Sequence, residues 1–235
     1  MYFPMYYDPT YFLVLIGVVF SLVAQAKVNS AFSKYSQVGN YVRVTGAEAA
    51  QRILHGAGVY DVRVEHIAGN LTDHFDPRSK VLRLSDAVYG QVSVAAIGVA
   101  AHECGHAIQH ARGYAPLKLR SVLVPVANFG AKIAWPLIIF GLFLTSKTSA
   151  LLIELGIIAF LGSVLFQIVT LPVEFNASNR AIQILGESGM LQNDELRGAR
   201  KVLNAAALTY VASAATAILQ LFRILLLVGG RRRND

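Results

Sequence analysis

Long apolar stretches alternate with polar segments along the chain. Residues 9–26 hold no charged side chain, and about 20 such residues are needed for an α-helix to cross a hydrocarbon core of ~30 Å. Two further apolar stretches lie within residues 122–173, and the link between them is short. This pattern predicts an N-terminal transmembrane anchor over residues 1–26 and an antiparallel transmembrane hairpin over 122–173.

The first apolar stretch also has one feature of a cleavable signal peptide. Ala24-Gln25-Ala26 resembles a cleavage site, but no Lys or Arg precedes the stretch, whereas a signal peptide begins with a basic segment. The tyrosines of this region are typical of the aromatic belt at a membrane interface; they are Tyr2, Tyr6, Tyr7 and Tyr11. We therefore favour an uncleaved span, with a signal peptide as the alternative.

Residues 27–121 have the pattern of a small domain that folds in water. Thr45 followed by Glu48 forms a capping-box signature and predicts the start of a short helix. Alternating apolar and polar residues over 59–85 predict two or three short antiparallel strands. A second helix is expected from Ser93 to about Arg112, where a glycine ends it.

The C-terminal third of the chain is polar first and apolar afterwards. Residues 174–204 predict a polar helix next to the small domain. Residues 205–235 predict an apolar helix followed by a basic tail. The apolar helix either spans the membrane or lies against it, and the sequence leaves both possibilities open.

The composition assigns these elements to a class of protein. Hydrophobic residues make up 54% of the chain and charged residues 15%, and the mean hydropathy is +0.48; soluble domains carry roughly 25% charge. Disordered chains and disulfide scaffolds are excluded, the latter because Cys104 is the single cysteine. The expected fold is a mainly α integral membrane protein with a small α+β domain and a short antiparallel sheet.

The distribution of the net charge of +7 predicts the orientation in the membrane. Residues 27–120 and 174–204 hold 15 of the 21 Lys and Arg residues. The positive-inside rule therefore places the polar domain in the cytoplasm and the N-terminus outside. The basic tail favours contact with a lipid surface, and no basic platform interleaved with aromatic residues indicates a nucleic-acid partner.

The segment His102-Glu103-Cys104-Gly105-His106 carries the clearest chemical signal. Histidines four residues apart on a helix lie on one face, one turn apart, and can bind the same zinc ion. Glu103 then lies beside the water that completes the zinc site, where its carboxylate can act as general base. The motif predicts one catalytic Zn²⁺, with His102 and His106 as ligands.

A third protein ligand is expected for a catalytic zinc of this type. His110 lies about 12 Å along the helix from His102, from a rise of ~1.5 Å per residue, which is too far for the same ion. Glu174 is the better candidate, because the hairpin returns it to the face that holds His106, and a carboxylate at a membrane boundary needs a partner. Ser178 is a candidate partner of a ligand imidazole, and Arg180 a candidate for holding a substrate carbonyl, an oxyanion or a lipid phosphate.

The chain resembles the YugP-type neutral zinc metallopeptidases of bacterial membranes. The likeness rests on the motif at His102, the hairpin, and the segment Pro-Val-Glu-Phe-Asn-Ala-Ser around Glu174; it covers nearly the whole chain. The chain is more distantly similar to the HtpX and CAAX-prenyl proteases. This resemblance implies a zincin-like domain, His102, His106 and Glu174 as zinc ligands, Glu103 as general base, and the bacterial cytoplasmic membrane as location.

The same resemblance has two further implications. The distant relatives carry an Asp four residues after the glutamate ligand, where this chain has Ser178. Such enzymes also offer a strand edge to an extended substrate, and residues 79–84 are the strand expected to do so.

Three functions follow from these observations. The first is a membrane-bound zinc metalloendopeptidase that acts on proteins or peptides, with membrane proteins among the candidate substrates. The second is an intramembrane protease of the site-2 type, in which the zinc motif lies within a span. The third is a non-catalytic membrane scaffold or chaperone-like subunit. No motif identifies a regulatory partner.

Overall fold

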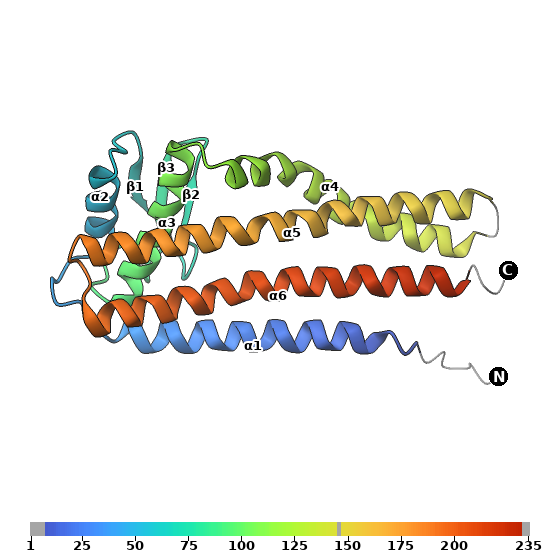
Figure 1. Ribbon diagram of the computed structural model, residues 1–235, viewed down its shortest axis with the longest axis horizontal. Helices are drawn as coiled ribbons and strands as arrows, with labels where there is room; N and C mark the ends of the chain where they lie inside the picture. Colours follow the sequence, from blue (N-terminus) through green and yellow to red (C-terminus); the bar gives the residue numbers. More distant parts are fainter. Residues whose placement is uncertain (1–7, 145–146, 232–235) are drawn as a thin grey trace. The chain divides into compact units, whose positions relative to one another are not determined.

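The computed structural model describes residues 8–144 and 147–231 (Figure 1). The elements follow in the order α1 (Tyr11–Ser36), α2 (Gly46–Gly56), β1 (Arg63–His66), β2 (His74–Asp76), β3 (Val81–Leu84), α3 (Val94–Ala111), α4 (Ala115–Phe143), α5 (Lys147–Glu187) and α6 (Asn193–Arg231). Tyr2, Tyr6, Tyr7 and most of the basic tail lie outside the described residues.

The chain divides into two compact units. The apolar unit comprises Met1–Val23, Arg120–Val169 and Val211–Asp235, and the site unit comprises Ala24–Leu119 and Thr170–Tyr210. Helices α1, α5 and α6 each contribute residues to both units.

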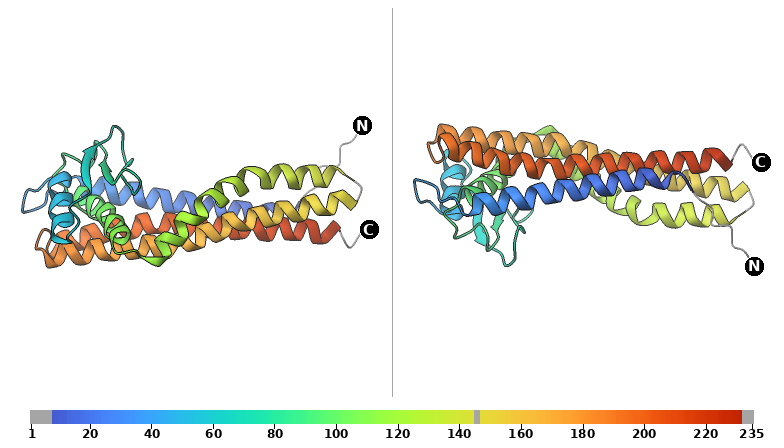
Figure 2. Two further views of the ribbon diagram at one scale, coloured as in Figure 1. Left: turned by 90° about the horizontal axis from the view of Figure 1, so that it is seen from above. Right: turned by 90° about the horizontal axis from the view of Figure 1, so that it is seen from below.

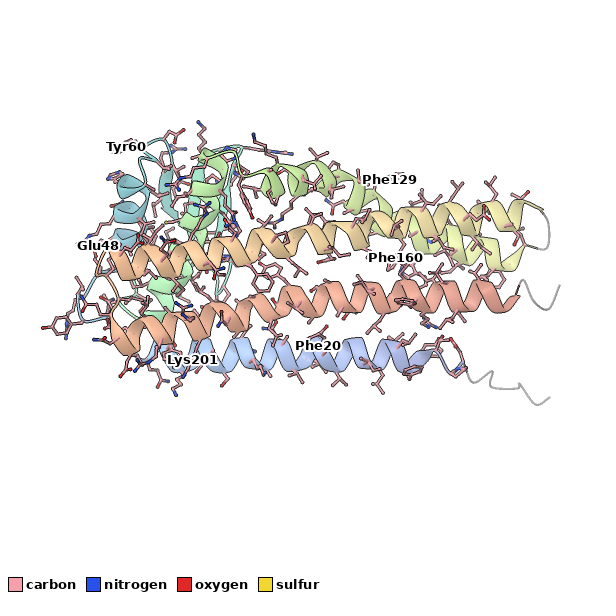
Figure 3. All side chains as sticks on the ribbon, viewed as in Figure 1. Phe20, Glu48, Tyr60, Phe129, Phe160 and Lys201 are labelled. Carbon is pink, nitrogen blue, oxygen red and sulfur yellow. The ribbon has the colours of Figure 1, made fainter. Side chains whose placement is uncertain are left out.

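Four helices in the described part of the chain are long and apolar enough to cross a membrane: α1, α4, α5 and α6. Large apolar side chains on them are exposed: Leu15, Phe129 and Ile158 are each more than 60% exposed. Figure 3 shows the side chains along these helices and labels Phe129. A water-soluble surface does not carry so many apolar side chains in contiguous patches. The helices thus have the surface expected of a membrane protein.

Helices α4 and α5 form an antiparallel pair within the apolar unit (Figure 2). Small residues allow their backbones to approach closely: a Cβ atom on Gly130 would lie 2.3 Å from the carbonyl oxygen of Ala159. Ser163 Oγ donates a hydrogen bond to the Ala127 carbonyl at 3.2 Å. Small residues and hydroxyl groups are the usual means of helix association in a bilayer.

The C-terminal apolar segment is part of α6, which pairs with α1. Thr216 Oγ1 donates to the Gly17 carbonyl at 3.2 Å, and Arg223 Nη2 lies 3.1 Å from the Asp8 carboxylate. The Arg223 guanidinium also covers the Tyr11 ring, 4.3 Å from its centroid. The segment whose position the sequence left open lies in α6, which is one of the four candidate spans, and it runs alongside α1.

The site unit contains a three-stranded sheet in the order β1-β3-β2. β2 pairs with β3 as an antiparallel hairpin, but β1 pairs with β3 in parallel, so the prediction of an all-antiparallel sheet was wrong. Alternating polarity identifies strands but does not determine their direction of pairing. The expectation that residues 79–84 form an exposed edge was also wrong, because β3 is the central strand and β2 is an edge.

Local signals predicted the helices of the site unit well, and their boundaries less well. The capping box of α2 is confirmed, since the Glu48 amide donates to Thr45 Oγ1 and the Glu48 carboxylate accepts from the Thr45 amide. The helix expected to begin at Ser93 is α3, capped by the Ser93 hydroxyl. The single helix expected over 174–204 is instead the end of α5, a turn, and the start of α6.

Helix α3 lies at the centre of the site unit and packs against elements from the whole of that unit. Cys104 faces α2, with its Sγ 3.5 Å from the Ala50 carbonyl, and Gly98 faces Ala199 of α6. Burial raises the pKa of the Cys104 thiol well above its ordinary value, so this cysteine is an unreactive packing residue. The helix that carries the candidate zinc motif is thereby fixed on several sides.

Candidate metal centre

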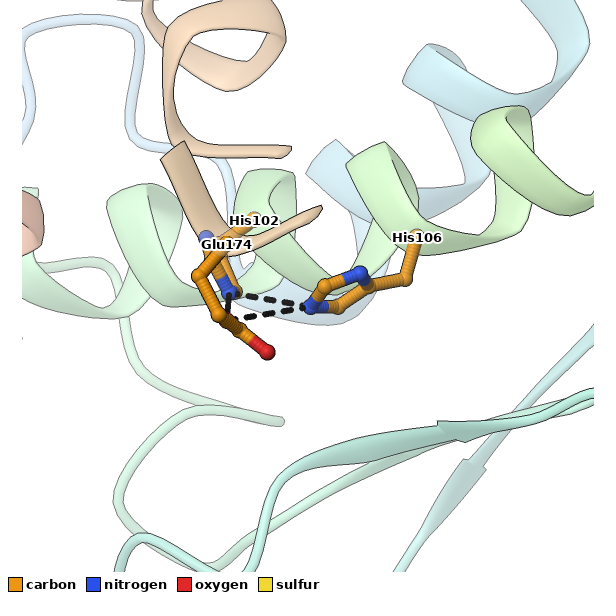
Figure 4. A group of neighbouring side chains, drawn as sticks. All are labelled: His102, His106 and Glu174. Carbon is orange, nitrogen blue, oxygen red and sulfur yellow. Dashed lines mark hydrogen bonds and ion pairs between the residues drawn. The ribbon is translucent and has the colours of Figure 1, made fainter. Parts of the chain in front are cut away.

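Two helices bring the candidate ligands together. His102 and His106 are one turn apart on α3, and their imidazole rings are 4.7 Å apart, edge to face. Glu174 comes from α5, where only 2% of its side chain is exposed. Figure 4 shows the two imidazoles and the carboxylate converging on one point.

Gly105 allows α3 and α5 to approach closely enough for this arrangement. A Cβ atom at position 105 would lie 2.7 Å from the Ala177 carbonyl oxygen and 3.1 Å from the Ala177 Cα. Both are backbone atoms of α5, so they can move only if the helix moves. The glycine in the motif is therefore needed for helix contact, and Glu174, one turn before Ala177, depends on that contact.

We expect Gly105→Ala to lower the free energy of unfolding by about 1–3 kcal/mol, as overpacking does, although alanine is the better helix former by ~1 kcal/mol. Thermal unfolding of the purified protein followed by circular dichroism measures this. Gly98→Ala is the matched control, because a Cβ atom there meets the Ala199 Cβ at an ordinary 3.4 Å. Equal melting temperatures of the two variants would contradict the explanation.

The three ligand atoms form a nearly equilateral triangle. His102 Nε2 lies 3.2 Å from His106 Nε2 and 3.2 Å from Glu174 Oε2, and His106 Nε2 lies 3.5 Å from the same carboxylate oxygen. Tetrahedral zinc with bonds of ~2.0–2.1 Å would separate its ligands by about 3.3 Å. Among the described residues, this is the one group of three His, Cys, Asp or Glu side chains that meets the spacing of a metal site.

The electrostatics of the site favour a cation. Burial alone would lower the pKa of His106, but the hydrogen bond with Glu174 and the charges of Glu103 and Glu174 outweigh it and raise the pKa above its ordinary value. A carboxylate beside two imidazoles thus stabilises positive charge at this point. A metal ion that binds here displaces a proton, so its affinity is expected to rise with pH.

Glu103 follows His102 on α3 and is 9% exposed. Its Oε2 accepts a hydrogen bond of 3.1 Å from the backbone amide of Phe75. Phe75 is the middle residue of β2, so this contact joins the carboxylate to the edge strand of the sheet. Phe75 and Glu103 are 28 positions apart, so no local pattern in the sequence indicates this contact.

Of the other predicted residues, Ser178 contacts a candidate ligand, whereas Arg180 and His110 contact other side chains. Ser178 is buried, and its Oγ lies 3.1 Å from His102 Nδ1, as expected of a partner of an imidazole. Arg180 donates a hydrogen bond from its Nε to Asn176 Oδ1 at 2.7 Å. His110 is exposed and packs against the Phe75 ring, with 5.7 Å between centroids; it is outside the metal group.

Gln109 is a site residue that the sequence analysis missed. Its side chain is fully buried and lies 3.1 Å from His106 Nδ1. The signal that could have identified it is its spacing, three residues after His106 and thus on nearly the same face of the helix.

Comparison with known proteins identifies relatives along almost the whole chain. Residues 10–229 match the model of a family described as "Putative neutral zinc metallopeptidase". The chain belongs to this family. It is also 49% identical over 224 residues to "Putative membrane protease YugP" of Bacillus subtilis, covering 95% of this chain and 98% of the relative. No solved structure matches significantly.

Membership of the neutral zinc metallopeptidase family confirms the resemblance predicted from the motif, the hairpin and the segment around Glu174. It also implies zinc as the metal. The residues of the triangle fit that metal by donor type, since two imidazoles and one carboxylate are the ligands of one common class of catalytic zinc site.

Proposed function

We propose that this chain is a membrane-bound zinc metalloendopeptidase, in which His102, His106 and Glu174 hold the zinc and Glu103 is the general base. The observation that carries the proposal is the triangle of ligand atoms with sides of 3.2, 3.2 and 3.5 Å. Zinc bound there would polarise a substrate carbonyl and make a water molecule more acidic.

The residues of the chain supply the rest of the reaction. Glu103 is adjacent to a zinc ligand and carries the carboxylate that accepts the proton of the attacking water and passes it to the leaving amine. The Phe75 amide restrains that carboxylate through its 3.1 Å hydrogen bond. Ser178 Oγ contacts the ring of His102 on the side away from Glu174 Oε2, and so restrains its rotation.

The edge strand β2 is the candidate site for the substrate backbone. It pairs on one side with β3, and its middle residue, Phe75, directs its amide to Glu103. An extended peptide along this edge would have its backbone next to the general base; the Phe75 amide is already bonded to Glu103, so other main-chain groups of the edge would pair with the peptide. This replaces residues 79–84 as the proposed substrate strand.

The distribution of basic residues supports a cytoplasmic active site in the bacterial cytoplasmic membrane. Fifteen of the 21 Lys and Arg residues lie in residues 27–120 and 174–204, and the four apolar helices supply the candidate spans.

Removal of the metal tests the proposal. We expect the full-length protein, purified in detergent without chelators, to contain one zinc ion per chain and to hydrolyse casein or a membrane-protein substrate. Phenanthroline should abolish hydrolysis, and added Zn²⁺ should restore it, since the ligands hold the metal reversibly. A protein without stoichiometric zinc would instead favour the scaffold or chaperone-like function.

The site-2 type of intramembrane protease fits the structure less well. In that class the zinc motif lies within a span, but α3, which carries the motif, is absent from the four candidate spans of the described residues. Its neighbours are the sheet and helices of the site unit.

A further inference from the structure

The Gln109 side chain makes three polar contacts, one with His106 and two with residues of α5. Its amide nitrogen donates to the Val173 carbonyl at 2.8 Å and to Asn176 Oδ1 at 3.0 Å, and its oxygen faces His106 Nδ1 at 3.1 Å. The side chain is 0% exposed. A buried amide with all of its polar groups paired is held in one orientation.

These contacts determine which nitrogen of His106 carries the proton. The Val173 carbonyl can only accept a hydrogen bond, so the nitrogen of the Gln109 amide must face it and the oxygen must face His106. An amide oxygen also can only accept. The hydrogen of a neutral His106 therefore resides on Nδ1, which leaves the lone pair of Nε2 pointing at His102 and Glu174.

The two histidines differ in how firmly their tautomer is fixed. The partner of His102 Nδ1 is the Ser178 hydroxyl, which can rotate and can either donate or accept. Gln109 has no such freedom. It also connects His106 to the backbone of Val173, the residue before Glu174, so one side chain links the positions of two candidate ligands on different helices.

We propose that Gln109 is a positioning residue, whose amide oxygen fixes the tautomer and ring orientation of His106. The proposal rests on the proposed metal site and deepens it. Loss of such a partner typically lowers metal affinity or activity by about 10–100-fold.

Two substitutions at Gln109 separate its two contacts. Gln109→Met has a similar size and removes both. Gln109→Glu keeps an acceptor for His106 Nδ1 but removes the donor to Val173 and Asn176. Zinc affinity of the full-length protein, measured by competition with a chromophoric chelator, should fall about 10–100-fold in Gln109→Met and stay near the parental value in Gln109→Glu. The visible spectrum of the Co²⁺-loaded protein should change only in Gln109→Met.

Equal zinc affinity in the parent and Gln109→Met would overturn the proposal. An equal loss in both variants would overturn it too, because the contact with α5 would then be the important one. If Gln109→Met does not fold by circular dichroism, Gln109→Glu decides alone: retained affinity supports the proposal and lost affinity overturns it. Gln183→Met, at an exposed glutamine of α5, controls for the substitution itself.

Zinc affinity also separates this proposal from the proposed function. If the affinities follow the expected order but no variant or parent hydrolyses a peptide, the peptidase assignment fails and the role of Gln109 stands. If the parent hydrolyses peptides and all zinc affinities are equal, the peptidase assignment stands and the proposed role of Gln109 fails.

Discussion

Glu103→Gln is expected to lower the rate of peptide hydrolysis by about 10²–10⁴-fold, the usual contribution of a general base, while one zinc ion remains bound. Glutamine has nearly the same shape, and its amide oxygen can still accept the 3.1 Å hydrogen bond from the Phe75 amide. It cannot take a proton from water at neutral pH. The measurement is kcat on casein or a membrane-protein substrate, together with the zinc content of the same preparation.

Glu65→Gln is a suitable control for this variant. Glu65 is on β1, at the edge of the sheet opposite to β2, and its exposed side chain pairs with Arg63 and Arg83. Surface ion pairs contribute little to stability, so this variant should cleave at the parental rate. If zinc-loaded Glu103→Gln also cleaves at that rate, Glu103 is not the general base.

The parts of the site that sequence predicted depend on local spacing. His102 and His106 share one face of α3 because four residues make about one turn, and the Ser93 cap and the capping box of α2 depend on residues three apart. The pairing of Glu174 with them was predicted from topology, since the hairpin had to return the chain to the same side. The structure brings these three residues together, and their role as ligands remains a prediction.

The parts that sequence did not predict depend on distant residues. Parallel pairing of β1 with β3, and hence the edge position of β2, follows from how the chain crosses the sheet. Contacts of the Phe75 amide with Glu103 and of Gln109 with Val173 join residues that are 28 and 64 positions apart. No periodicity within one element indicates such contacts, and Gln109 also has the ordinary appearance of a helical glutamine.

Glu174→Gln is expected to reduce zinc affinity by more than the 10–100-fold that follows loss of an outer partner, because it alters a proposed ligand directly. The Glu174 carboxylate is the one anion of the triangle, with its Oε2 3.2 Å from His102 Nε2 and 3.5 Å from His106 Nε2. A neutral amide of the same size is a poorer zinc ligand and no longer offsets the charge of the ion. Chelator competition measures the affinity, and hydrolysis should be lost in parallel at limiting zinc.

Two variants on the same helix control for this result. Glu187→Gln changes an exposed carboxylate at the end of α5 that accepts a hydrogen bond from Gln183, and it should bind zinc like the parent. Ser178→Ala removes the hydroxyl 3.1 Å from His102 Nδ1 and should have the intermediate effect of an outer partner. If Glu174→Gln retains more zinc affinity than Ser178→Ala, Glu174 is not a ligand, and a different third group must complete the site around His102 and His106.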